Sequence, residues 1–412
     1  MIEGLNILYL THRFPYPPAG GAKVRAFHCI ERLSKRNRVT VAAPLRDSEE
    51  AAAADDLKGM VAGVLTAPIR PIQALAQLAG GSALLRSASV GYFYSPKLAR
   101  LIRAHLSETK VDLIVVHSSA VAHYVAGAQA PKVLDFVDID SRKWMDYSRH
   151  KRFPLSLGYA LEGYSLARAE VALARHFDLN LVATDFERDT LHALAGEVPA
   201  SVVRNGVDLT YFSPGEDIHD PERICFIGRM DYFPNEQAVE TFCRDSLPII
   251  RRTRPNAQVQ IVGAEPTAAV RALERIEGVE VTGTVPDVRP YVRASAVTVA
   301  PLAIARGTQN KILESMAMGV PVVASALAAR GVDAEPERHL LTGASPEEIA
   351  AQTLRVLTDP KERTRLAEAG RARVAERHAW PAALDEFEAR LAAYLGTPEN
   401  REPGKKESAH VA

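Results

Sequence analysis

The residues best suited to bind a phosphorylated ligand lie in the segment 306–319. A polar loop, 306–310, leads into a helix-like stretch that carries Lys311 and Glu314, and Gly319 ends this stretch before an apolar run. A lysine at a helix N-terminus opposes the helix dipole, and this cost is understandable where an anion binds. Lys311 and Glu314 are three residues apart and share a helix face. A lysine for phosphate and a carboxylate for ribose hydroxyls together predict a nucleotide site.

Two glycine-containing turns add candidate phosphate contacts. Gly20 and Gly21 lie between the first predicted strand and the first predicted helix, where glycine lets the backbone approach a ligand and the helix offers free N–H groups. Their spacing is neither GxGxxG nor a Walker A loop, so a plain turn is an equal alternative. Arg229 follows the apolar run 224–227, a position suited to a phosphate at the end of a strand. A surface ion pair is the alternative for this arginine.

A basic and aromatic segment follows the apolar run 133–136. Its members are Arg142, Lys143, Trp144, Tyr147, Arg149, Lys151 and Arg152. The next residues, 153–161, are largely apolar, and this combination is typical of an interfacial membrane contact. The apolar segment Ile69–Leu85 is a second candidate. A helix packed in the protein core explains either segment equally well.

Short apolar runs alternate with helical patterns along the whole chain, which predicts βαβ units in doubly wound parallel sheets. The strands predicted in the first half are 6–10, 39–42, 113–116, 133–136 and 179–183. Those predicted in the second half are 224–227, 259–262, 279–282, 297–300 and 320–324. The fold class is therefore α/β with two Rossmann-like domains.

Turn residues between 205 and 215 mark the boundary between the halves. A long charged helical stretch is predicted from 359 to about 395. The predicted organisation is an N-terminal domain at 1–212, a second domain at 213–375, a helix at 376–396 that packs back toward the first domain, and a disordered tail at 397–412.

Composition excludes several classes of protein. The 412 residues include 50 basic and 50 acidic residues, so the chain lacks the basic excess of a protein that coats nucleic acid, and we expect no nucleic-acid partner. The hydrophobic fraction of 47% predicts a sizeable core. No segment is apolar enough to predict a spanning helix. Three cysteines, Cys29, Cys225 and Cys243, make no disulfide framework, which favours the reduced cytoplasm.

The sequence resembles glycosyltransferase family 4, retaining enzymes with the GT-B fold, over about residues 5–395. The segments that carry this resemblance are Asn205-Gly206-Val207-Asp208 with Phe212 and Pro214, FIGRM at 226–230, and ILESMAMGVPVVAS at 312–325. A closer match is to the exopolysaccharide sugar transferases associated with PEP-CTERM/exosortase loci. The segments that carry it are 133–144, 228–235 and 305–314.

The resemblance implies two domains that face a central cleft, in which a nucleotide diphosphate sugar such as a UDP- or GDP-sugar binds without a metal. Glu314 matches the glutamate that binds the donor's ribose hydroxyls, and Arg229 matches the arginine that contacts the diphosphate. Gly20 and Gly21 match the glycine loop that faces the distal phosphate and the donor sugar. The residues matching the loop whose amides meet the sugar and phosphate are Gly307, Thr308, Gln309, Asn310 and Lys311.

Three positions depart from the family pattern. Arg306 stands where the family has its first glutamate, and Pro234 stands where it has a lysine. Val137 replaces a histidine before Asp138. Lys311 is our hypothesis for the missing positive charge, and we predict Arg229, Lys311 and Asp138 as the catalytic residues.

Asp138 and Asp140 form a DxD pair. In the other glycosyltransferase fold such a pair coordinates Mg²⁺ or Mn²⁺, but the GT-B resemblance implies no metal and we expect none here. We expect polar residues of the cleft at these positions, and capping of the following segment by Asp140 or Ser141 is an equal alternative.

The resemblance implies a cytoplasmic hexosyltransferase that retains the anomeric configuration by front-face displacement. Its acceptor would be an exopolysaccharide or a polyprenyl-diphosphate-linked precursor, with peripheral contact at the inner face of the cytoplasmic membrane. Two alternatives stay open. A nucleotide-sugar 2-epimerase of the same fold would need carboxylates and histidines around the sugar ring, and a non-catalytic protein would bind the nucleotide sugar only.

Overall fold

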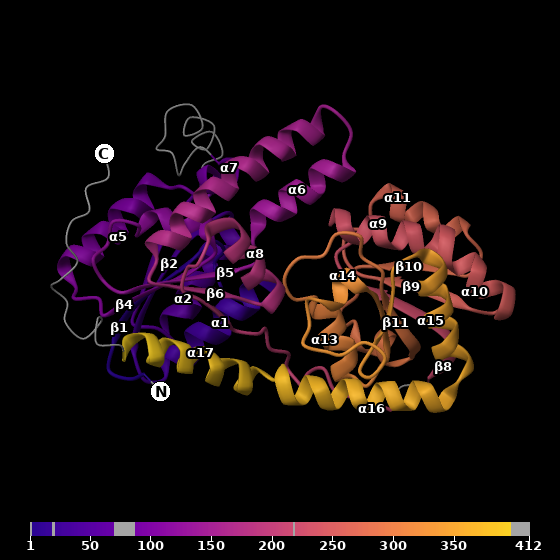
Figure 1. Ribbon diagram of the computed structural model, residues 1–412. Helices are drawn as coiled ribbons and strands as arrows, with labels where there is room; N and C mark the ends of the chain where they lie inside the picture. Colours follow the sequence, from indigo (N-terminus) through magenta and orange to yellow (C-terminus); the bar gives the residue numbers. More distant parts are fainter. Residues whose placement is uncertain (1, 19–20, 70–86, 217–218, 397–412) are drawn as a thin grey trace. The chain divides into compact units, whose positions relative to one another are not determined.

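The computed structural model describes residues 2–18, 21–69, 87–216 and 219–396, which form two compact units (Figure 1). Of the described residues, unit 1 contains those between positions 2 and 203 and between 384 and 396, and unit 2 contains those between 204 and 383. The chain therefore leaves unit 1 once, builds unit 2, and returns. The α/β class with two Rossmann-like domains, predicted from the alternation of apolar runs and helical patterns, is confirmed.

Unit 1 is built on a seven-stranded sheet with the order β3-β2-β1-β4-β5-β6-β7, and all its strand pairs are parallel. The strands are β1 (Asn6–Thr11), β2 (Arg38–Leu45), β3 (Gly63–Pro68), β4 (Leu113–His117), β5 (Lys132–Val137), β6 (Leu179–Val182) and β7 (Ala200–Val202). Consecutive residues such as Ile7 and Leu8 are both buried, because helices cover both faces of a parallel sheet. The helices are α1 (Gly21–Ser34), α2 (Ser48–Lys58), α4 (Ala88–Tyr92), α5 (Pro96–Glu108), η2 (Ser119–Tyr124), α6 (Asp140–His150), α7 (Leu155–His176) and α8 (Asp185–Ala195). The part of α17 (Trp380–Leu395) that begins at Leu384 also belongs to unit 1.

Unit 2 is built on a six-stranded parallel sheet with the order β10-β9-β8-β11-β12-β13. The strands are β8 (Asp220–Ile227), β9 (Gln258–Val262), β10 (Val279–Gly283), β11 (Ser295–Ala300), β12 (Val322–Ser325) and β13 (Leu341–Gly343). The helices are α9 (Phe233–Thr241), η3 (Phe242–Ser246), α10 (Leu247–Thr253), α11 (Ala268–Arg271), η4 (Ala272–Arg275), α12 (Arg289–Arg293), α13 (Asn310–Ala317), α14 (Ala326–Ala329), α15 (Pro346–Thr358) and α16 (Pro360–Arg377).

Several helices begin at residues whose side chains accept a hydrogen bond from the first turn. Thr184 accepts from the N–H of Glu187 before α8, and Ser345 accepts from the N–H of Glu348 before α15. Asp359 accepts from two first-turn N–H groups before α16. Such caps satisfy N–H groups that have no partner inside the helix, so these residues define where the helices start.

The helical stretch predicted from 359 to about 395 consists of two helices in the structure. α16 ends at Arg377 and α17 begins at Trp380. Pro381 lies in the first turn of α17, and its missing N–H prevents a continuous helix through this point. Past Leu384, Glu388 of α17 accepts a hydrogen bond from Arg32 of α1 at 2.8 Å, so this part of α17 packs within unit 1.

Within the described ranges, no helix has both the length and the apolar character needed to cross a membrane. Residues 70–86, which contain nearly all of the apolar segment Ile69–Leu85, lie outside the described residues, and so do Gly20 and the predicted tail.

Candidate functional site

In unit 2, the candidate residues follow two neighbouring strands at the point where the strand order reverses. Gly228 and Arg229 follow β8, and the loop 301–309 follows β11 and leads into α13. β8 pairs with both β9 and β11. β9 and β10 lie on one side of β8, and β11, β12 and β13 lie on the other, so the strand order reverses between β8 and β11. Ligands of open α/β sheets bind at the carboxyl ends of strands at such a reversal.

Lys311 is the buried cation of this region. Only 9% of the residue is exposed, its Nζ donates a hydrogen bond to Oδ1 of Asn235 at 2.6 Å, and Nζ lies 4.1 Å from the ring centroid of Phe226. Burial lowers the pKa of Lys311 to about 7, and the negative charge of Glu314 opposes this shift. A neutral amide and an aromatic ring stabilise an ammonium group less than a carboxylate does. Lys311 therefore has the capacity to bind an anion strongly.

Asn235 has no role in the sequence predictions, although it ends the segment 228–235. The structure places its side chain between Lys311 and Arg229, because its Nδ2 donates to the carbonyl of Arg229 at 2.8 Å. A Cβ on Gly228 would lie 2.7 Å from this Nδ2 and 3.3 Å from Nζ of Lys311. Glycine at 228 thus leaves the space in which the amide orients the lysine.

Arg229 is largely exposed and bound to two carboxylates. Its guanidinium donates to Asp231 at 2.8 Å and to Glu265 at 2.6 Å, and these interactions raise its pKa. The ion pair that the sequence left as the alternative for Arg229 is therefore present. Its contact with a diphosphate stays a prediction.

The last loop residues before α13 and the first residue of α13 contain buried polar atoms without partners. Oγ1 of Thr308 and Oδ1 of Asn310 are buried and make no hydrogen bond. Gly307 has φ +55°, and Gln309 precedes α13 without capping it by its side chain, although its Nε2 donates to the carbonyl of Arg306. Buried polar atoms normally have a partner, so unpaired ones beside a free helix N-terminus indicate a ligand site.

Glu314 lies one turn beyond Lys311 on α13 and is partly buried. Burial raises the pKa of Glu314 to about 7, and the positive charge of Lys311 opposes the shift. The structure therefore places Asn310, Lys311 and Glu314 on α13, directly after the loop residues 307–309. Gly21 is in unit 1, where it is the exposed first residue of α1.

In unit 1, Asp138 follows β5 at the carboxyl edge of the sheet. The preceding Val137 has φ +63°, which is strained for a β-branched residue. Oδ1 of Asp138 is buried without a hydrogen-bond partner. Burial, followed by the charges of Glu187 and Asp140, raises the pKa of Asp138 to about 8. At neutral pH this carboxyl group can therefore carry a proton and donate a hydrogen bond.

Asp140 is the first residue of α6, and burial raises its pKa. The helix start is held by other carboxylates, because Glu187 accepts from the N–H of Ile139 at 2.8 Å and Glu170 accepts from the N–H of Ser141 at 3.2 Å. Among the residues that the structure describes, no group of three or more His, Cys, Asp or Glu side chains is placed to hold a metal ion.

Sequence reasoning missed a buried ion pair beneath this edge. Arg25 of α1 donates to both carboxylate oxygens of Asp135, at 2.8 and 3.1 Å, and to the carbonyl of Val203. Nδ1 of His117 lies 3.3 Å from Asp135. Burial by itself raises the pKa of Asp135, but Arg25 and His117 outweigh it and bring this pKa below its usual range. The partners are distant in sequence, so no local pattern indicates them.

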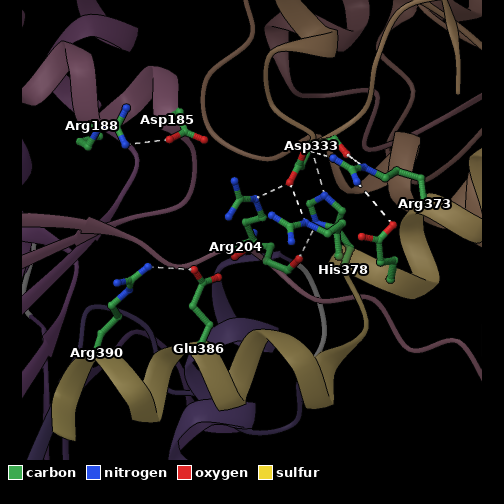
Figure 2. Close-up of polar contacts among 11 residues, drawn as sticks. Asp185, Arg188, Arg204, Asp333, Arg373, His378, Glu386 and Arg390 are labelled. Atoms are coloured by element: carbon green, nitrogen blue, oxygen red, sulfur yellow. Dashed lines mark hydrogen bonds and ion pairs between the residues drawn. The ribbon is translucent and has the colours of Figure 1, made fainter. Parts of the chain in front are cut away.

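The family-like segment 205–208 has a structural role in unit 2, where it meets the polar cluster of Arg204, Asp333 and His378 that Figure 2 shows. Asn205 accepts through its carbonyl from Nδ1 of His378 at 3.0 Å, and Nε2 of His378 accepts from the N–H of Asp333 at 3.1 Å. Asp333 also forms an ion pair with Arg204 at 3.0 Å. The residues at this sequence match therefore hold the start of unit 2 against His378, which lies between α16 and α17.

Comparisons with known proteins agree with this geometry. Residues 19–211 match the family model Glycosyltransferase Family 4, and residues 221–359 match the model Glycosyl transferases group 1. The D-inositol 3-phosphate glycosyltransferase of Nocardiopsis dassonvillei is 27% identical over 339 residues, which cover 71% of this chain and 73% of that protein.

Two solved structures share the fold across almost the whole chain. HepE of Anabaena, in complex with UDP and glucose, matches with a TM-score of 0.68 and 16% identity over 94% of this chain and 100% of its own. Sucrose-phosphate synthase of Thermosynechococcus elongatus matches with a TM-score of 0.68 and 16% identity over 95% of this chain and 99% of its own. The fold and the two matched models support the class of glycosyltransferases with the GT-B fold. The first half of the chain matches the family 4 model, and the second half matches the group 1 model.

Proposed function

We propose that this glycosyltransferase moves a hexose from a nucleotide diphosphate sugar to an exopolysaccharide or its polyprenyl-diphosphate-linked precursor, with retention of the anomeric configuration. The observation that carries the donor site is Lys311, a buried cation held by a neutral amide at the reversal point of the unit 2 sheet. UDP-sugars are the first donors to test, because UDP is bound in HepE. The resemblance of segments 133–144, 228–235 and 305–314 to exopolysaccharide sugar transferases supports the acceptor class.

Each donor-site residue has a defined task in this proposal. Lys311 and the N–H groups that open α13 stabilise the charge that grows on the diphosphate as the anomeric C–O bond breaks. Arg229 adds a second cation once phosphate oxygens replace Asp231 or Glu265 as its partners. Glu314 accepts hydrogen bonds from the ribose hydroxyls. The acceptor hydroxyl attacks from the face that the diphosphate leaves, and its proton passes to the departing phosphate oxygen.

Asp138 is our candidate on unit 1 for contact with a sugar or acceptor hydroxyl. Its unpaired, buried Oδ1 and raised pKa suit a carboxyl group that donates a hydrogen bond. We expect the reaction to need no metal. We also propose that the protein works in the cytoplasm, at the inner face of the cytoplasmic membrane, where lipid-linked acceptors lie.

The test combines binding and product analysis. The melting temperature of the purified chain is measured with UDP-, GDP-, ADP- and dTDP-sugars, with and without EDTA, since a ligand of the folded state must raise it. The stabilising donor is then incubated with polyprenyl-diphosphate-linked sugars, and the anomeric configuration of the product is read by NMR.

A transferred sugar with retained configuration, formed equally well in EDTA, supports the proposal. An inverted product contradicts the retaining mechanism, and loss of binding in EDTA contradicts the metal-free donor site. An epimerised donor identifies the 2-epimerase alternative, and binding without turnover over all acceptors identifies the non-catalytic one.

A further inference from the structure

Most of the large apolar side chains exposed in the described part of the chain gather on one helical hairpin. They belong to the loop between α6 and α7 and to the first turns of α7, and they are 52–79% exposed. These residues are Phe153, Leu155, Leu157, Leu161 and Tyr164. The other exposed large apolar residues, Met60, Tyr92, Tyr211 and Tyr232, are scattered and only 39–43% exposed. Contiguous exposed apolar surface marks an interaction site, whereas single apolar residues do not.

The exposed residues of α7 form a stripe. Leu157, Leu161 and Tyr164 follow the i, i+4, i+7 spacing of one helix face. The guanidinium of Arg168, one turn further, lies 5.7 Å from the ring centroid of Tyr164. The opposite face is buried, as at Leu166, so α7 is apolar on both its inner and its outer face. A helix that only met water would be polar on the outer face.

The hairpin is held in place by its inner residues. Trp144 of α6 stacks on Tyr159 of α7 with ring centroids 5.5 Å apart, and Tyr147 meets Tyr159 edge to face at 5.8 Å. A Cβ on Gly163 would lie 2.9 Å from the side chain of Met145, so the two helices pack closely. Figure 1 shows α6 and α7 side by side, joined at the tip by the loop that carries Phe153. The outer apolar side chains therefore have no room to turn inward.

The same tip is positively charged. Residues 149–161 contain Arg149, Lys151 and Arg152 and no acidic residue. The next acid, Glu162, accepts hydrogen bonds from the hydroxyl of Ser87 and the N–H of Ala88, each at 2.7 Å, and is thus directed to α4. A second copy of this chain would bring like charges together across a symmetric contact, whereas an anionic surface would pair with them.

We propose that the hairpin tip, residues 149–164, docks on an anionic phospholipid bilayer. The apolar side chains insert at the level of the acyl-chain boundary, and Arg149, Lys151 and Arg152 meet the lipid phosphates. This inference rests on the proposed function in one respect: docking holds the enzyme where a polyprenyl-linked acceptor lies. Neither the donor residues nor Asp138 belong to the tip.

The test is cosedimentation of the full chain with vesicles of phosphatidylcholine, alone or mixed with phosphatidylglycerol. The parent protein should bind the anionic vesicles and lose binding as salt is added. The charge variant R149Q/K151Q/R152Q should lower partitioning on the order of a hundredfold, since each basic residue near such a surface contributes about fivefold. The apolar variant F153S/L157S/L161S should lower it roughly tenfold or more.

Matched controls exist on the same unit. K97Q/R100Q/R103Q removes the same three charges from the exposed face of α5, and M60S/Y92S removes two exposed apolar side chains elsewhere. Both controls should partition like the parent. Melting temperature and solution binding of UDP-glucose, measured for every variant, separate misfolding and failure of the donor site from failure of docking.

Three results would overturn the inference. Binding that is equal for the parent and both tip variants shows that another surface docks. Absence of binding to anionic vesicles by a folded, donor-binding parent shows that the tip has no lipid partner. A parent dimer that the apolar variant converts to a monomer, with vesicle binding unchanged, assigns the stripe to self-association.

Discussion

Titration of Lys311 should make donor affinity fall steeply just above neutral pH. Burial lowers its pKa to about 7 in the free protein. A bound diphosphate favours the protonated form and raises this pKa again. Above pH 7 the free lysine is increasingly neutral, so binding must take up a proton. The protonated fraction falls from about one half at pH 7 to about 3% at pH 8.5, which predicts roughly a fifteenfold weaker affinity at the higher pH.

The assay is calorimetric titration with UDP-glucose, whose phosphates are both esterified and do not titrate in this range. Measurements at each pH in two buffers of different ionisation enthalpy give the number of protons taken up. Lys311→Met should abolish both the pH slope and the proton uptake, and should weaken binding at pH 7 by about tenfold or more, because a hydrogen bond to a charged group contributes about 1.5–3 kcal/mol.

Glu314→Gln is the control for the neighbouring carboxyl group. Burial raises the pKa of Glu314 to about 7, so it also titrates near neutrality. Its proton is lost as the pH rises, and a diphosphate nearby would oppose that loss. If the slope persists in Lys311→Met and disappears in Glu314→Gln, the assignment to Lys311 is refuted. A flat affinity from pH 7 to 8.5 in the parent refutes it as well.

Three further predictions concern stability, each read from urea unfolding. Gly206→Ala should destabilise by about 1–3 kcal/mol, because its Cβ would overlap the ring of Trp380, whereas Gly127→Ala has open space and should cost less. Asp135→Asn should cost about 3–5 kcal/mol, because it removes the carboxylate that neutralises the buried charge of Arg25. Because the pKa of Asp135 is lowered in the folded state, the ionised carboxylate contributes fully to stability above its unfolded pKa of about 3.9 and loses this contribution only in strong acid. The difference in free energy of unfolding between the parent and Asp135→Asn should therefore shrink as the pH falls below about 3.9. Asp333→Asn should lower the free energy of unfolding by about 1–3 kcal/mol, because it weakens the charged hydrogen bonds that Asp333 accepts from Arg373 and Arg377. Equal stability of variant and parent would contradict the anchoring role of this carboxylate.

The fold could be predicted because its signals are local. Runs such as 113–116 are apolar on both faces and short, which is typical of a buried parallel strand, and the structure places β4 at Leu113–His117. The sequence placed the start of the last helix at 376 and the structure begins α17 at Trp380, because a charged helical pattern continues on both sides of the break. Helix propensity predicts the presence of a helix more reliably than it predicts the residue at which the helix ends.

The candidate site could be predicted only where its residues share one element. Lys311 and Glu314 are on one helix, so their spacing indicates their common face. Asn235 reaches Lys311 from 76 residues away, and no spacing rule connects them. The same limit applied to the hairpin tip, where the sequence left a packed helix and an interfacial helix open. The structure shows that Phe153 and Leu161 are exposed rather than packed in the core, and exposure depends on what the rest of the chain covers. Contact of this segment with a membrane stays a prediction.

The anchor at His378 has a consequence for the modularity of the chain. The N–H of Val207 donates to the carbonyl of His378 at 2.7 Å, so the first and last segments of unit 2 run beside each other. Unit 2 is thus an inserted domain whose two ends meet, a topology that tolerates excision, circular permutation and transplantation. Any rotation of unit 2 must twist two neighbouring connections at once, which permits bending across the pair more readily than free swivelling.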